Sequence, residues 1–168
     1  MAVVTVKSAR ISGRDSTPPV RGGLTLGPRR LYDEVATVEV TNGDSIASKF
    51  ILATVPSHAS MRELLVYCDA ITSAAADFGV YRTTQDGGAV VDADAFGSAV
   101  SLASAITTGT NILHESGVLD ISEIEQPLWQ ILGLTADPGI DYDIVATLTA
   151  AATASGTLTA RAVYALGN

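Results

Sequence analysis

The alternation of apolar and polar residues near the C-terminal end is the feature that most restricts the fold of this chain. Residues 142–150 place an apolar side chain at every second position, and residues 158–166 repeat the pattern after a loop that ends at Gly156. Because successive side chains of a strand point to opposite faces, this two-residue period indicates half-buried β-strands. We expect the two segments to form an antiparallel hairpin whose apolar face belongs to the core.

Shorter segments of the same kind precede this pair. In residues 35–41, Ala36, Val38 and Val40 share one face, and the turn-forming Asn42-Gly43-Asp44 follows. The Ser60–Glu63 spacing resembles a helix capping box, but the compact apolar run that follows it favours a strand. Strands are predicted at residues 3–7, 35–41, 46–55, 64–68 and 78–82, with Val90-Val91 continuing the sheet.

Two segments have helical features. In residues 92–102, Asp92 or Asp94 can cap a helix on which Phe96 and Val100 share a face. Residues 127–132 begin with a proline, which suits the first helical position, and a glycine follows them. We expect a short helix in each segment.

The fold class predicted from these elements is mostly β. About eight short strands and one or two short helices in 168 residues favour a single antiparallel β-sandwich. Strands at both ends of the chain, with irregular segments between them, favour a jelly roll over an immunoglobulin-like sandwich. We assign residues 31–168 to this body. Residues 1–30 form an extended arm, because three prolines and four glycines between residues 8 and 30 oppose regular structure.

Charge divides the chain at the same place. The arm has six basic residues and one acidic residue, a net charge of +5, whereas the body has four basic and seventeen acidic residues, a net charge of −13. Such a contrast is typical of an end that binds a partner, although the arm could equally lie on its own acidic body or on that of a neighbouring copy. Nucleic acid is an unfavourable partner, since the arm lacks aromatic residues for base stacking and the body would repel a duplex. The candidate partner-binding residues are Lys7, Arg10, Arg14, Arg21, Arg29 and Arg30.

No pattern indicates an active site, a metal centre or a cofactor. The single Cys68 is expected to be a buried apolar residue, and His58 and His114 lie in no metal-binding spacing. Asp137, Asp141 and Asp143 lack the ligand spacing of a calcium loop, so we interpret this segment as a solvated loop with an aspartate at the entry to a strand. Serine catalysis by Ser57-His58 or His114-Glu115-Ser116 is disfavoured, because adjacency in sequence is not triad geometry. We also expect no signal peptide and no membrane helix.

Four stretches carry a resemblance to a known group of proteins. Residues 65–69, 92–100, 125–134 and 141–150 resemble segments of tailed-bacteriophage virion proteins, namely capsid decoration, or cement, proteins with a jelly-roll body. The resemblance covers about residues 33–166. It implies a structural protein, not an enzyme, that is made in the host cytoplasm and binds the exterior of an assembled capsid. Its partners would be the major capsid protein and neighbouring copies of itself. The alternative is a ligand- or carbohydrate-binding sandwich of a phage tail or fibre, and a hydrolytic or metal-dependent enzyme ranks third.

Overall fold

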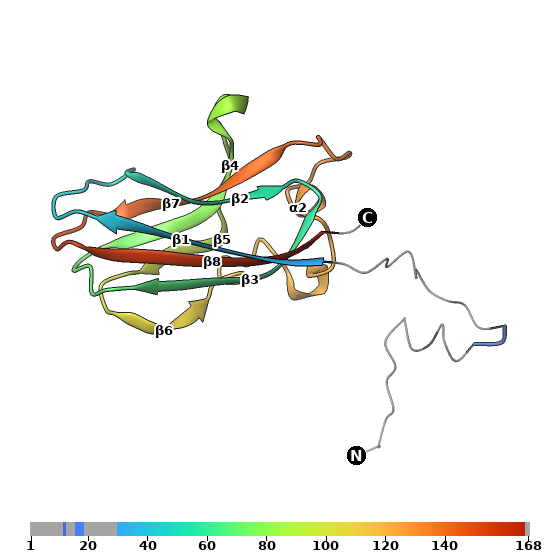
Figure 1. The fold of residues 1–168 in the computed structure, drawn as a ribbon, viewed down its shortest axis with the longest axis horizontal. Coiled ribbons are helices and arrows are strands. Elements are labelled where there is room, and N and C mark those ends of the chain that lie inside the picture. Colours follow the sequence, from blue (N-terminus) through green and yellow to red (C-terminus); the bar gives the residue numbers. More distant parts are fainter. Residues whose placement is uncertain (1–11, 13–15, 19–29, 167–168) are drawn as a thin grey trace, which may run out of the picture.

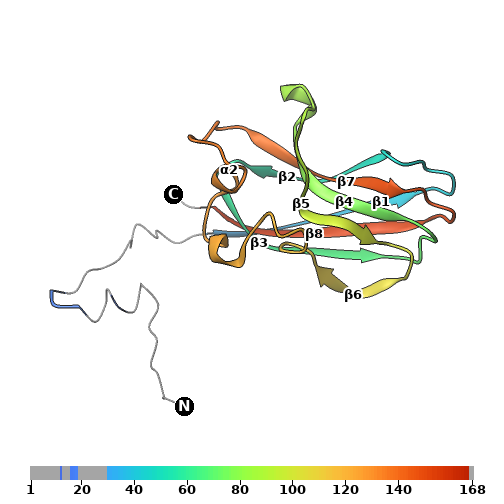
Figure 2. The ribbon, with the colours of Figure 1, turned by 180° about the vertical axis from the view of Figure 1, so that it is seen from behind.

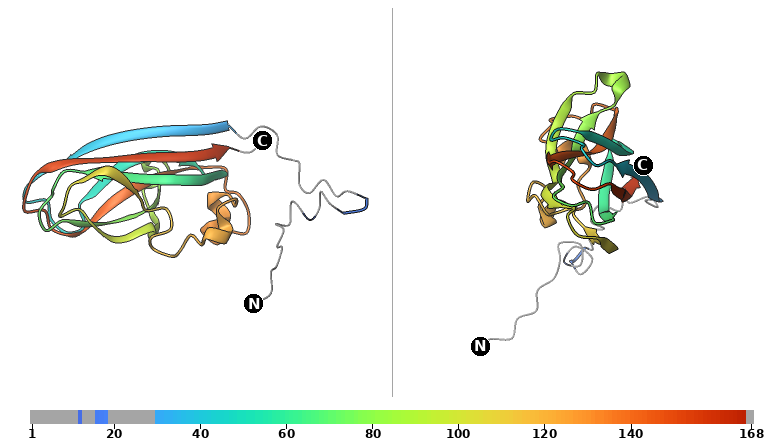
Figure 3. Two further views of the ribbon diagram at one scale, coloured as in Figure 1. Left: turned by 90° about the horizontal axis from the view of Figure 1, so that it is seen from below. Right: turned by 90° about the vertical axis from the view of Figure 1, so that its left-hand side faces the viewer.

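The computed structural model describes residues 12, 16–18 and 30–166. Eight strands form two four-stranded antiparallel sheets that face each other across a common core (Figures 1 and 3). The strands are β1 (Arg30–Val40), β2 (Lys49–Pro56), β3 (Ala59–Cys68), β4 (Ala75–Arg82), β5 (Val90–Ser101), β6 (Ile106–Asn111), β7 (Asp141–Ala150) and β8 (Gly156–Leu166). The helical segments are η1 (Thr84–Asp86), η2 (Ile121–Glu123) and α2 (Leu128–Ile131).

The strand order confirms the predicted antiparallel sandwich. One sheet has the order β1-β8-β3-β6 and the other has the order β2-β7-β4-β5. Eight strands that pass back and forth between two sheets in this order form a jelly roll. Figure 2 shows the second sheet from its own side, with β4 and β5 in front of the strands of the first.

The predicted C-terminal hairpin is wrong, although both of its strands exist. β7 pairs with β2 and β4, whereas β8 lies between β1 and β3 in the opposite sheet. The alternation was interpreted on the correct faces, because Leu148 and Leu158 both point into the core and are buried. A two-residue period identifies the buried face of a strand but not its neighbours, and here the loop between the strands crosses from one sheet to the other.

The predicted helix at residues 92–102 is also wrong, because this segment is strand β5. The register of β5 with β4 shifts at three places, and Ala99 has a φ of +50°. The spacing of four residues between Phe96 and Val100 fits one face of a strand as well as one face of a helix, so it could not distinguish the two. The backbone of Ala93 passes so close to Gly79 that a Cβ there would collide with its carbonyl group.

The other predicted elements that fall on described residues agree with the structure to within five residues. β3 extends over the whole ambiguous segment, so the Ser60–Glu63 spacing begins no helix. α2 follows Pro127 and ends before Gly133, whose φ is +74°. β2 begins at Lys49, three residues later than expected.

The core lies between the two sheets. Its largest fully buried side chains include Met61, Leu64, Phe78, Phe96 and Ile144. Cys68 belongs to the same cluster, as expected for a small apolar residue. The predicted strand at residues 3–7 and the basic residues from Lys7 to Arg29 lie outside the described residues. In the part of the chain that is described, no helix is long and apolar enough to cross a bilayer.

Candidate interaction surface

Ser57 and Asp137 form a structural pair. Ser57 is fully buried in the turn between β2 and β3, and its hydroxyl donates a hydrogen bond to the Asp137 carboxylate. Asp137 also accepts a bond of 2.9 Å from the Gly139 amide. These bonds, with the Ser57 hydroxyl as the largest cause, hold the pKa of Asp137 below its ordinary value. Because Ser57 is inaccessible and the adjacent His58 is exposed, the pair anchors a loop and is not arranged as a nucleophile with its base.

The segment His114-Glu115-Ser116 also fixes local structure. Its three side chains contact three different groups. His114 Nδ1 lies 2.9 Å from the Leu119 carbonyl oxygen. Glu115 accepts a 2.6 Å hydrogen bond from the Ser98 amide, and Ser116 donates a hydrogen bond to the Ala95 carbonyl. None of the three bonds to another. The segment therefore holds the loop after β6 against β5.

The structure separates Asp137 from the two acidic residues at the start of β7, Asp141 and Asp143, and Asp143 is buried and not solvated as expected. Asp137 bonds to Ser57, whereas Asp141 and Asp143 line a pocket of about 390 Å³ together with Asp86. Thr54 donates a 2.7 Å hydrogen bond to Asp143 there. Among the described residues, no three His, Cys, Asp or Glu side chains come close enough together to hold a metal ion.

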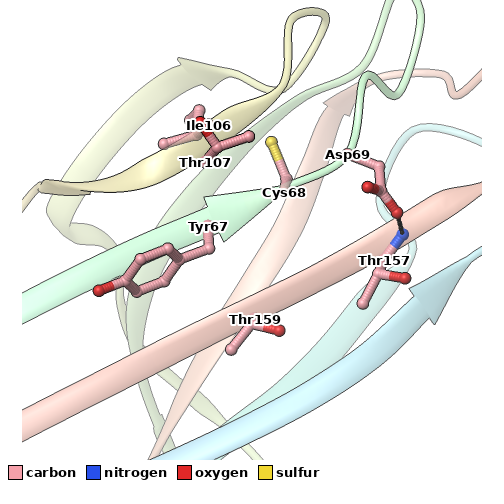
Figure 4. A pocket seen from close by; sticks show the side chains of 7 residues that line it. All are labelled: Tyr67, Cys68, Asp69, Ile106, Thr107, Thr157 and Thr159. Atoms are coloured by element: carbon pink, nitrogen blue, oxygen red, sulfur yellow. Dashed lines mark hydrogen bonds between the residues drawn. The ribbon is translucent and has the colours of Figure 1, made fainter.

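A second pocket, of about 270 Å³, lies beside the end of β3 (Figure 4). Tyr67 covers Gly109, where an added Cβ would stand 2.6 Å from the ring. Asp69 accepts a 3.0 Å bond from the Thr157 amide, and burial raises the pKa of the Cys68 thiol. A buried, protonated thiol is a poor nucleophile, so this pocket offers no evident chemistry.

The outer side of β1 is the most distinctive surface of the described molecule. β1 is the edge strand of its sheet, and the described residues pair it with β8 alone (Figure 3). Leu31 and Val35 lie on its solvent side and are 69% and 60% exposed. Tyr32 is the one aromatic side chain of the described residues that is more than a third exposed, and its ring stacks on Tyr164 at 5.5 Å.

The charges on β1 are mostly negative. Arg30 is opposed by Asp33, Glu34 and Glu39, which gives this strand a net charge of −2. Arg161 binds Asp33 through two hydrogen bonds of 2.8 and 2.6 Å, which hold the pKa of Asp33 below its ordinary value. Glu34 and Glu39 have no cationic partner among the described residues.

We name the free backbone side of β1, together with Leu31 and Val35, the β1 edge. Sequence reasoning placed the site in the arm and did not identify this surface. Of the candidate residues, the structure describes Arg30 alone, at the exposed start of β1. A signal was present in the sequence, since Leu31 and Val35 fall on the opposite face from Ala36, Val38 and Val40.

Comparison with known proteins gives a likeness in structure alone. No family model and no curated protein matches the sequence. A chain of the cyanophage Pam1 capsid asymmetric unit superimposes with a TM-score of 0.53 and 15% identity, over 82% of this chain and 86% of that one. A chain from the acidic stable capsid structure of Helicobacter pylori bacteriophage KHP30 matches at 12% identity, over 83% and 94% of the two chains, with a TM-score of 0.43. The second score is too low to support an argument. At these identities the first likeness shows a common fold.

Proposed function

We propose that this chain is a virion structural protein that binds the outer surface of an assembled phage capsid and stabilises it, as a decoration or cement protein does. The observation that carries the proposal is the jelly roll that it has in common with a chain of the Pam1 capsid. The match covers more than four fifths of both chains, so the two proteins have nearly the same length. A sandwich body preceded by a long basic segment suits a bracing role.

Charge favours a place on the exterior of the shell. The body carries a net charge of −13, and packaged nucleic acid is a dense polyanion. A body inside the shell would be repelled by the genome, whereas one outside is separated from it by the capsid wall.

The arm supplies the proposed attachment. Its Lys7, Arg10, Arg14, Arg21, Arg29 and Arg30 can meet carboxylates of the major capsid protein or of a neighbouring copy. A segment of some 20 residues reaches roughly 60 Å when extended, which is far enough to cross onto another subunit.

Stabilisation would then follow from mass action. A protein that binds the assembled lattice and not its free subunits lowers the free energy of the lattice at every occupied site. Copies repeated over a shell, and arms that link them, turn a modest contact into a strong one through avidity.

The test uses phage particles from the native source, stripped of this protein and then titrated with it. We expect the protein to sediment with the particles and to raise the temperature at which a nucleic-acid dye detects genome release, up to saturation. An unrelated acidic protein at the same concentration is the control. Antibody labelling of intact particles then tests the exterior location. A protein that neither sediments with the particles nor shifts genome release is not a cement protein.

A further inference from the structure

The four edge strands of this jelly roll differ in how well they are protected. β6 is short, its pairing with β3 is interrupted, and the registers of β2 and β5 with their neighbours contain shifts. β1 pairs with β8 over 11 residues, from Arg30 opposite Leu166 to Val40 opposite Gly156, without a bulge or a proline. Natural sheets shorten, bulge or cover their edges to prevent pairing with other chains. β1 is therefore the one edge of the described sheets that is long, regular and open.

The side chains on this edge also favour a partner. Leu31 and Val35 project from the solvent side of the sheet at more than half of their possible exposure. An added strand would cover part of both side chains while it satisfied the backbone N–H and C=O groups that point away from β8.

From these features we infer that residues 3–7 of one copy add as a strand to the β1 edge of a second copy. The segment Val3-Val4-Thr5-Val6-Lys7 is rich in β-branched residues, which favour strands. The inference rests on the proposed function, because it names the neighbouring copy as the partner of the arm.

Charge favours residues 3–7 over the β1 strand of another copy as the partner of the β1 edge. The arm brings Lys7 and, three residues later, Arg10 towards an edge on which Glu34 and Glu39 have no cationic partner in the described part of the chain. Pairing β1 with β1 of another copy would instead bring two acidic strands together.

The sequence of the arm allows it to reach a neighbouring copy. Pro28 precedes β1 by two residues, and proline and the residue before it favour extended backbone, which opposes a tight turn that would fold the arm straight back onto β1. More than 20 residues separate Lys7 from β1, so residues 3–7 can reach the edge of the next molecule.

Hydrogen exchange of the full-length protein at several concentrations tests the inference without a capsid. The test variant is Val4→Pro/Thr5→Pro, which removes one N–H donor from each side of the proposed strand, so that the side facing β1 loses a donor in either register. The control variant, Val20→Pro/Thr25→Pro, adds the same number of prolines elsewhere in the arm. We expect exchange in residues 30–40 to slow about tenfold as the concentration of the intact and control proteins rises, and to stay fast in the test variant.

Each other outcome overturns the inference in a distinct way. Protection that is independent of concentration and lost in the test variant would mean that the arm pairs with its own β1. Protection that depends on concentration but persists in the test variant would mean that β1 pairs with β1. Fast exchange under all conditions would mean that the edge binds no copy. Because these measurements use free protein, a failure of the arm to pair with β1 can be distinguished from a failure of the protein to bind particles.

Discussion

Thr149 has a buried hydroxyl oxygen with no hydrogen-bond partner in the described structure. It lies in β7, where the register with β4 shifts between Ala75 and Ala76. Replacement by valine keeps the shape of the side chain and removes the unsatisfied group, so Thr149→Val should raise the free energy of unfolding by about 1 kcal/mol. Urea denaturation measures the change.

The matched control for this substitution is Thr159→Val. The Thr159 hydroxyl bonds to Thr37 at 2.9 Å on the solvent side of the sheet, so its loss should be neutral or slightly destabilising. A lower stability for Thr149→Val than for the control would show that the Thr149 hydroxyl has a partner, such as a bound water molecule.

Asp137 provides a prediction for acid sensitivity. Its pKa in the folded protein lies below its ordinary value of 3.8, so its ionised form stabilises the fold at neutral pH. That contribution is present above about pH 4 to 5 and is lost as the pH falls towards the folded pKa. Asp137→Asn should therefore lower the melting temperature at pH 7 and make its decline between pH 5 and 3 less steep. Parallel pH curves for the two proteins would contradict this assignment.

At the scale of elements, the sequence predicts the kind of structure better than the partners of each strand. Alternation identified the buried faces of β1 and β8 because burial on one face leaves a two-residue period. β7, expected to be half-buried, is buried on both faces from Tyr142 to Ala146. The same pattern does not show to which sheet a strand belongs, so the predicted pairing of β7 with β8 is wrong. β5 was missed because its bulges are held by groups distant in the sequence, which no local pattern reveals.

The contribution of two distant carboxylates to the bulge in β5 can be tested directly. Asp77 accepts a 2.7 Å bond from the Ala99 amide, and Glu115 accepts one of 2.6 Å from the Ser98 amide. Asp77→Ala/Glu115→Ala should speed hydrogen exchange at these two amides and destabilise the fold by about 1 to 2 kcal/mol. Glu125→Ala, which removes an exposed carboxylate before α2, is the control. Unchanged exchange at Ser98 and Ala99 would mean that the bulge does not depend on the carboxylates.

At the scale of the whole molecule, the sequence and the structure indicate different parts of the proposed interaction surface. The charge contrast between arm and body is visible in the sequence because it depends on composition alone. The exposed face of Leu31 and Val35 has a signal in the sequence, but the position of β1 at an edge is visible only in the structure, because it depends on the topology of all eight strands.

The contribution of the arm to attachment is testable in the full chain. Replacing Lys7, Arg10, Arg14, Arg21, Arg29 and Arg30 by glutamine removes every positive side-chain charge of the arm and leaves its length unchanged. At roughly 0.5 kcal/mol for each exposed ion pair, the loss is about 3 kcal/mol, or about a hundredfold in affinity for particles. Binding of the intact protein should weaken as salt rises, whereas binding of the variant should change little. Sedimentation with stripped particles at low and high salt measures both effects. Circular dichroism verifies the fold, and Arg82→Gln, which removes an exposed charge of the body, is the control. If the variant binds as tightly as the intact protein and retains its salt dependence, the arm does not attach the protein to the shell by charge.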